Sequence, residues 1–258
     1  MKTKVSVALA MLLAVVLLAG CGPKVPESAL VAYTSANAKM KETTALAADI
    51  TINIAMTAMG QEADVGITAH VAQAPDAAGN VQMATEMSMG FMGMSLDMNM
   101  YYTDGMMYMD AMSSKVKSPM SFEDARQQGS PQVNVDITEN AIKEQHMETT
   151  DDGYVLTFVL DGEAMADALK SQLGSALGDA DANLNIGDIN TKAVVGKDGQ
   201  MKSMEMDFTF AMDTQGQMIE AACTMSMTNI QTKDVTVTLP DDLDSYTETE
   251  DIGAVSPL

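Results

Sequence analysis

The chain has 258 residues, 47% of them hydrophobic, which suits one domain or two small ones with a substantial apolar core. Its 36 acidic and 14 basic side chains give a formal net charge of −22 at pH 7, and such a surface excludes nucleic acid as a partner because it repels phosphate. Aromatic residues make up only 4%, Trp is absent, and methionine occurs 26 times.

The first twenty residues have the features of a secretion signal. Two lysines precede an apolar run, Val5–Leu18, which is too short to cross a membrane and has the length of a signal-peptide core. The run ends in "LAGC", Leu18–Cys21, which resembles the lipobox of bacterial lipoproteins. This resemblance implies cleavage between Gly20 and Cys21 and attachment of diacylglycerol to the Cys21 thiol.

Lipidation at Cys21 would place the protein on the extracytoplasmic face of the cell membrane, because two or three acyl chains suffice for stable attachment. Removal of residues 1–20 takes away Lys2 and Lys4 and no acid, so the net charge becomes −24. The protein surface would then repel anionic lipid head groups. Residues 21–26 are the lipidated cysteine and a short tether, which predicts a folded part close to the bilayer.

The first half of the chain predicts one helix followed by hairpins. Leu30, Tyr33, Asn37 and Met40 recur at helical spacing and predict a helix over 27–44. From there the apolar residues alternate with polar ones, which predicts strands with one apolar and one polar face. The predicted hairpins comprise residues 49–72, 81–100 and 101–110, the last of them turning at Asp104-Gly105.

The second half predicts helices and a further run of strands. The segment 118–132 is predicted as a break with one helical turn, and 138–147 as a short helix capped by Thr138. An amphipathic helix is predicted over 161–178, capped by Asp161, with Met165, Leu169, Leu173 and Leu177 along one stripe. Strands are predicted at 154–161, 188–196, 201–212, 217–229 and 232–240. The acidic segment 241–258 is predicted to be a flexible tail.

These elements predict an α+β fold, in which antiparallel strands with one apolar face form an open, curved sheet over a few helices. Each half of the chain joins one amphipathic helix to a run of strands, as an ancient duplication would produce. No repeat of individual residues between the two halves proves such a duplication. We expect about 9–11 strands in a single domain, residues 27–240.

Three features together carry a resemblance to a known superfamily. They are the lipobox with its following short helix, the segment "YTDGMMYM" at Tyr102–Met109, and a last predicted strand that ends in "VTLPDD", Val237–Asp242. Over about residues 25–245 the chain resembles LolA/LppX-like proteins, especially Gram-positive lipoproteins. The resemblance implies an open β half-barrel with helices plugging a hydrophobic cavity, and relatives that bind or carry acyl chains or lipoproteins. No residue matches a named ligand contact of that superfamily.

Methionines recur in Met-x-Met pairs on the predicted strands, so both members of a pair lie on one face. With neighbouring phenylalanines they are the candidate lining of an apolar cavity: Met83, Met87, Met89, Met94, Met98, Met100, Met204, Met206, Phe208, Phe210, Met225 and Met227. Core packing alone would explain them, since each buried side chain stabilises the fold by about 1.5–3 kcal/mol. A cavity that adapts to varied apolar ligands is an alternative. Cu(I) binding through thioethers and reversible oxidation are further alternatives.

Other chemistry is weakly supported. Neither His70 nor His146 lies at ligand spacing from a methionine, except for the adjacent Met147, and no catalytic or phosphate-binding motif occurs. The segment 179–190 begins like a calcium loop but has Leu184 where glycine is required and Asn190 where glutamate is required. Cys223 alternates with apolar residues and has no basic neighbour, which predicts a buried, unreactive thiol.

The sequence therefore predicts a lipid-anchored, non-enzymatic protein that binds an acyl chain or another apolar ligand in a methionine-rich cavity, without cofactor or metal. A structural or interaction lipoprotein with a filled core is one alternative, and a Cu(I) or oxidant buffer is another. The membrane, through the N-terminal lipid, and a lipid or hydrophobic small molecule are the expected partners. The oligomeric state stays open.

Overall fold

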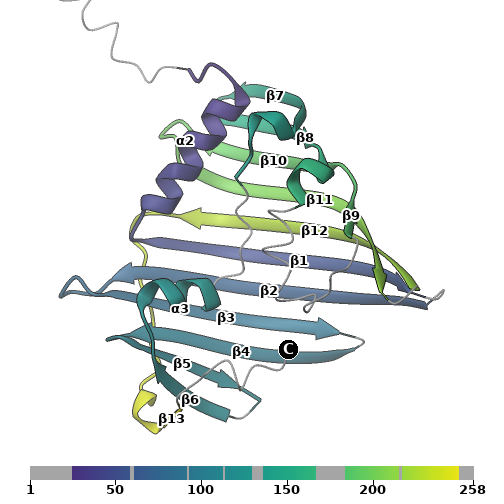
Figure 1. Ribbon diagram of the computed structural model, residues 1–258. Helices are drawn as coiled ribbons and strands as arrows, with labels where there is room; N and C mark the ends of the chain where they lie inside the picture. Colours follow the sequence, from purple (N-terminus) through teal and green to yellow (C-terminus); the bar gives the residue numbers. More distant parts are fainter. Residues whose placement is uncertain are drawn as a thin grey trace, which may run out of the picture.

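The computed structural model describes residues 25–58, 61–91, 93–112, 114–129, 136–166, 184–214 and 217–249. The predicted signal peptide, Cys21 and most of the helix predicted over 161–178 lie outside these residues, as do Leu169, Leu173 and Leu177. Figure 1 shows the described strands as one broad, open sheet with the helices on one side.

Thirteen strands are found among the described residues, more than the 9–11 predicted. The strands of the first half are β1 (Leu46–Ala58), β2 (Gln61–Pro75), β3 (Val81–Phe91), β4 (Met94–Thr103), β5 (Met106–Ala111) and β6 (Ser114–Pro119). Those of the second half are β7 (Ile142–Thr150), β8 (Gly153–Leu160), β9 (Leu184–Ile186), β10 (Ile189–Gly196), β11 (Met201–Thr214), β12 (Gln217–Gln231) and β13 (Thr247–Glu248). The helices are α2 (Ala29–Glu42) and α3 (Phe122–Gly129); residues 162–166 are also helical, and 3-10 turns lie at Glu139–Ala141 and Leu243–Ser245.

The first and the last long strands, β1 and β12, lie side by side in the middle of the sheet. The strand order is β13-β6-β5-β4-β3-β2-β1-β12-β11-β10-β8-β7, and β9 pairs with β11 beyond the end of β10. From β1 the chain runs as a meander to β6, crosses by α3 to the opposite edge at β7, and returns strand by strand to β12 (Figure 1). The described pairings are antiparallel, apart from the parallel pair β13–β6.

The predicted two-residue alternation is confirmed by the strand register. On the apolar face Ile52 lies opposite Ile67 on β2 and opposite Met225 on β12, whereas Thr51 lies opposite Thr68 on the polar face. Because successive side chains of a strand point to opposite faces, this register gathers the apolar side chains of neighbouring strands on one side.

Helices α2 and α3 cover parts of this apolar face. Helix α2 begins at the cap Ser28, whose hydroxyl accepts a hydrogen bond from the Val31 N–H, and it runs over β7, β8, β10 and β11. Its Tyr33 ring packs edge-on against Phe158 at 5.7 Å. Helix α3 lies over β3 and β4, where Phe122 contacts Tyr102 with ring centroids 5.5 Å apart.

The core accordingly forms two clusters. The larger lies under α2 and includes Tyr33, Phe158 and Met204, and the smaller lies under α3 and includes Met83 and Met107. Met87 packs against both clusters. Helix α3 has eight residues, longer than the single helical turn predicted within 118–132.

Two predicted elements are wrong. Residues 138–147 are not a helix: after a 3-10 turn that Thr138 does not cap with its side chain, Ile142–Thr150 forms the edge strand β7. An edge strand has a neighbour on one side only, and most side chains of β7 are exposed, so its sequence lacks the apolar alternation of a half-buried strand. Residues 232–240 form no strand, because β1 and β11 already occupy both edges of β12.

The predicted flexible tail is also wrong for residues 241–249. Strand β13 pairs with β6, and the Thr249 N–H donates a hydrogen bond to the Lys117 carbonyl. Tyr246 is 4% exposed and packs edge-on against Tyr108. Lys115 binds Asp242 at 2.6 Å. These contacts hold the acidic segment against the far edge of the sheet.

Candidate functional site

The twelve side chains predicted to line a cavity lie on the apolar face but do not share one environment. Six of them are in the larger cluster and at most 7% exposed: Met204, Met206, Phe208, Phe210, Met225 and Met227. Met83 and Met100 belong to the cluster under α3. Met87, Met89 and Met98 are half-buried, and Met94 is 68% exposed. A common cavity lined by all twelve stays a prediction.

The part of the apolar face that the described helices leave accessible lies on β1 to β4. In one cross-strand row Ile52 is opposite Ile67, Ile67 opposite Met89, and Met89 opposite Leu96. The next row continues this surface toward the hairpin ends. We call the two rows together the open apolar face, and its residues are Ile52, Ile54, Val65, Ile67, Met89, Phe91, Met94 and Leu96. Phe91 and Met94 are exposed, and the other six are partly buried, on a face that is otherwise core.

Most of these residues escaped the sequence-based prediction, which followed the methionines. Only Met89 and Met94 were named, whereas Ile67 and Leu96 were not. They occupy alternate positions of the predicted hairpins, on the same face as the methionines. This pattern could have identified them, because a tight turn fixes which residues lie opposite one another.

Exposure changes along the strands from one end of the face to the other. At the end under α3, Met83 and Met107 are fully buried and Ala125 packs over them. At the hairpin end of the same strands, Phe91 is 39% and Met94 68% exposed. Figure 1 shows the β1–β2 and β3–β4 hairpin ends at the right of the sheet, with α2 and α3 over its left part. The face is therefore closed at one end and open at the other.

No residue of the open apolar face carries an ionisable side chain. Contiguous apolar surface that remains accessible on a folded protein marks a site for an apolar ligand, a partner or a membrane. Such a surface cannot perform acid–base or nucleophilic chemistry, because it offers no proton donor, acceptor or nucleophile.

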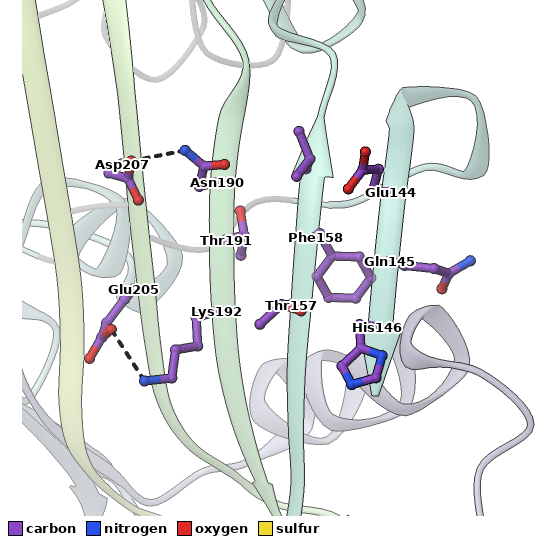
Figure 2. A pocket seen from close by; sticks show the side chains of 11 residues that line it. Glu144, Gln145, His146, Thr157, Phe158, Asn190, Thr191, Lys192, Glu205 and Asp207 are labelled. Atoms are coloured by element: carbon purple, nitrogen blue, oxygen red, sulfur yellow. Dashed lines mark hydrogen bonds and ion pairs between the residues drawn. The ribbon is translucent and has the colours of Figure 1, made fainter. Parts of the chain in front are cut away.

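The polar face of the sheet carries shallow hollows of different character. Figure 2 shows one of about 330 Å³ across β7, β8, β10 and β11. In it Lys192 lies 3.9 Å from the Glu205 carboxylate, and the Asn190 amide donates a 3.0 Å hydrogen bond to Asp207. His146 lies on its wall, on strand β7 rather than on the predicted helix.

A second hollow, of about 550 Å³, is lined by Asp49 and His70, two members of a hydrogen-bonded trio. Asp49 accepts a 2.6 Å hydrogen bond from the Asn229 amide, and its other oxygen lies 2.6 Å from His70 Nδ1. These hydrogen bonds, first from Asn229 and then from His70, lower the pKa of Asp49 below its ordinary value. Within the described ranges, no three His, Cys, Asp or Glu side chains gather closely enough to hold a metal ion.

Two buried ionisable groups of the larger cluster stay protonated at neutral pH. Cys223 is 2% exposed, and burial raises the pKa of its thiol to about 11. The predicted buried thiol is confirmed. Burial also raises the pKa of Tyr33, so its hydroxyl stays protonated and donates to Met204 Sδ at 3.4 Å.

Comparison with known proteins gives one family and a few distant structures. The model of a family of unknown function (DUF6612) matches residues 27–245. No curated protein matches the sequence. The family description does not name the LolA/LppX-like superfamily, so membership of that superfamily stays a prediction.

Three solved structures are similar over most of both chains. LprF from Mycobacterium bovis is 11% identical, covers 83% of this chain and 96% of its own, and has a TM-score of 0.37. A DUF1329 family protein from Desulfovibrio piger ATCC 29098 is 10% identical, with coverages of 84% and 96% and a TM-score of 0.24. A beta-barrel-like DUF1849 protein from Brucella abortus is 8% identical, with coverages of 76% and 99% and a TM-score of 0.21. None of these three similarities assigns a ligand or an activity to this chain.

In the described part of the chain, no helix has both the length and the apolar character needed to cross a membrane. The predicted lipidation site, Cys21, lies outside that part.

Proposed function

Because the chain belongs to DUF6612, a family of unknown function, we propose a function from its own residues. The protein is a lipid-anchored, non-enzymatic component of the cell envelope. It binds an acyl chain or another apolar molecule on the open apolar face of β1–β4.

The observation that carries this proposal is the accessible apolar surface on a face that is otherwise core. Burying one methylene group is worth about 0.8 kcal/mol, so an alkyl chain laid along two cross-strand rows would gain several kcal/mol. The closed end under α3 limits how far a chain can enter. The open hairpin end leaves room for a polar head.

The methionines suit such a surface. Met87 lies opposite Met98, and Met89 opposite Leu96, at the boundary between core and open face. Methionine is flexible and polarizable, so it fills gaps of varied shape and is common on adaptable binding surfaces. A face of this kind would accept chains of different length.

The lipobox supports the proposed location. Acylation at Cys21 would place the sheet within a short tether of the bilayer, where acyl chains are available. The LolA/LppX-like resemblance of the sequence supports the same ligand class.

The proposal can be tested on residues 22–258, which contain both core clusters and every described strand. Dodecyl maltoside, an uncharged amphiphile, is titrated below its micelle concentration and its binding is followed by calorimetry and native mass spectrometry. One molecule should bind per chain. Met89→Gln should weaken this binding about tenfold, because it places an amide on the face.

Met218→Gln is the matched control, because Met218 on β12 is 58% exposed and alternates with Ile219, which places it on the polar face of the sheet. Its affinity for dodecyl maltoside should equal that of the unchanged chain. Absence of binding, or equal loss in both variants, would favour the alternative of a structural or interaction lipoprotein with a filled core. Tight binding of Cu(I) in place of the amphiphile would favour the metal alternative.

A further inference from the structure

We propose that the ligand of the open apolar face is a single-chain amphiphile with a positively charged head, which stays at the hairpin ends beside Phe91 and Met94. This inference rests on the proposed function and adds the chemical class of the ligand.

The orientation follows from the closed and open ends of the face. Buried charge without a partner is strongly unfavourable, and none of the side chains that form the open apolar face can pair with a charge. The alkyl tail therefore points toward the buried end near Met87 and Met98. The head remains at the solvent-exposed end, where Met94 is 68% exposed.

The charge of the head follows from the strands around it. None of β1, β2, β3, β4 and β12 contains a lysine or arginine. Carboxylates are present at their hairpin ends: Thr57 at the end of β1 lies opposite both Glu62 and Glu220, and Ala55 lies opposite Asp64. The three acids are exposed, and the described residues of these strands offer no lysine or arginine to neutralise them.

These carboxylates lie on the polar face, so they act on a head group across the edge of the sheet rather than by contact. Charges interact over about 8 Å at physiological ionic strength. Asp64 precedes Val65, the partner of Phe91, and lies within about this range, whereas Glu62 and Glu220 are farther along or across the sheet and act mainly at low ionic strength. The hairpin end therefore repels an anionic head, such as a fatty-acid carboxylate, and attracts a cationic one.

Phe91 is an independent indication of a cation. Phe91 lies at the end of the open apolar face, is 39% exposed, and is the cross-strand partner of Met94. Quaternary ammonium groups bind favourably against the face of an accessible aromatic ring. A carboxylate or phosphate would find no hydrogen-bond donor among the side chains of Phe91 and Met94.

The test compares three probes with the same dodecyl chain on residues 22–258: dodecyltrimethylammonium, dodecyl maltoside and laurate. At about 20 mM salt the cationic probe should bind about tenfold more tightly than laurate, with the uncharged probe between them. At about 500 mM salt the three affinities should converge, because the charges are screened. Met89→Gln should weaken binding of the cationic probe as well.

A double variant, Glu62→Gln with Asp64→Asn, tests the source of the preference. It should lower the affinity for dodecyltrimethylammonium at low salt about threefold or more and leave that for dodecyl maltoside unchanged. Glu148→Gln with Asp151→Asn removes the same charge from exposed positions at the β7–β8 end of the sheet and should change neither affinity.

Laurate binding as tightly as the cationic probe at low salt overturns the inference while the proposed function stands. Equal effects of the two double variants also overturn it, because the attraction would then come from the overall charge. If none of the three probes binds, the proposed function fails and this inference fails with it.

Discussion

The hydroxyl of Tyr33 on α2 donates a hydrogen bond to Sδ of Met204 on β11 at 3.4 Å, and this contact joins the N-terminal helix to the far half of the sheet. Tyr33 is 1% exposed, and its ring also packs edge-on against Phe158. Helix α2 depends on such contacts because its sequence is only weakly amphipathic along much of its length, with small alanines on the buried side.

Tyr33→Phe should lower the free energy of unfolding by about 1 kcal/mol, because it removes a hydrogen bond and keeps the ring. Tyr33→Ala should lower it by about 3–5 kcal/mol, since it leaves a cavity against Phe158 and Met204. Urea unfolding of residues 22–258 measures both. A Tyr33→Ala variant as stable as the unchanged chain would contradict the packing of α2 on the sheet.

The thiol of Cys223 should react very slowly in the folded protein. Its pKa of about 11 lies above the value of about 8.5 for an unfolded cysteine, so the folded state holds the thiol proton more tightly. Its contribution to stability is present below about pH 8.5 and is lost as the pH rises toward 11. Iodoacetamide labelling at pH 8 should require urea.

Cys223→Ala is the comparison for the pH effect. The decline in unfolding free energy between about pH 8.5 and 11 should be smaller in this variant than in the unchanged chain. Rapid labelling of Cys223 without urea would show that β12 is accessible at this position.

Attachment of the C-terminal segment should depend on the pair Lys115–Asp242. The hydrogen bond to Asp242 raises the pKa of Lys115, and the same bond lowers the pKa of Asp242. The lysine contribution is present below its unfolded pKa and lost as the pH rises through the raised folded value. The carboxylate contribution is present above its unfolded pKa and lost as the pH falls through the lowered folded value.

Asp242→Asn should therefore speed hydrogen exchange of the Thr249 amide several-fold at neutral pH, since that amide bonds to the Lys117 carbonyl. Asp244→Asn removes an equal charge from an exposed position in the same segment and should leave the exchange rate unchanged. Equal rates in both variants would mean that Tyr246 packing alone holds the segment.

Methionine oxidation should follow exposure rather than sequence. Met94, Met112 and Met218 are 58–68% exposed, whereas Met83 and Met107 are fully buried. Under mild peroxide the exposed three should form sulfoxides first, as measured by peptide mass spectrometry over time. Oxidation of Met83 or Met107 at the same rate would contradict the closed end under α3.

Much of the sheet could be predicted because its signals are local. Alternation placed the strands, and Asp104-Gly105 marked a hairpin turn that is confirmed, with φ of 52° and 77° at the two residues. These positive φ values are accessible to Asp and Gly, which is why the pair is a reliable turn signal.

The errors concern long-range pairing. The polar sequence of Ile142–Thr150 becomes a strand only because β8 offers a free edge. Val235 and Val237 form no strand because both edges of β12, the strand before them, are already paired. Neither fact can be read from the local sequence. An alternating pattern shows which residues could share a face, but the sheet order decides whether a partner strand is available.

The candidate site was predicted in outline only. The methionines do lie on the apolar face, but α2 and α3 cover much of it, so Met204 and Met83 are core while Met94 is open. Where a helix docks depends on contacts between distant segments, such as that of Phe122 with Tyr102. The accessible rows on β1–β4 therefore emerge only from the structure.

The measurement that tests ligand binding on the open apolar face most directly is site-mapped photo-crosslinking on residues 22–258. An uncharged dodecyl glycoside carrying a diazirine on its chain is irradiated with the protein, and the labelled residues are identified by peptide mass spectrometry. We predict saturable labelling of Ile67, Met89 and Leu96, competed by dodecyl maltoside. Labelling confined to the polar face, for example around Lys192, or no saturable labelling at all, would contradict it.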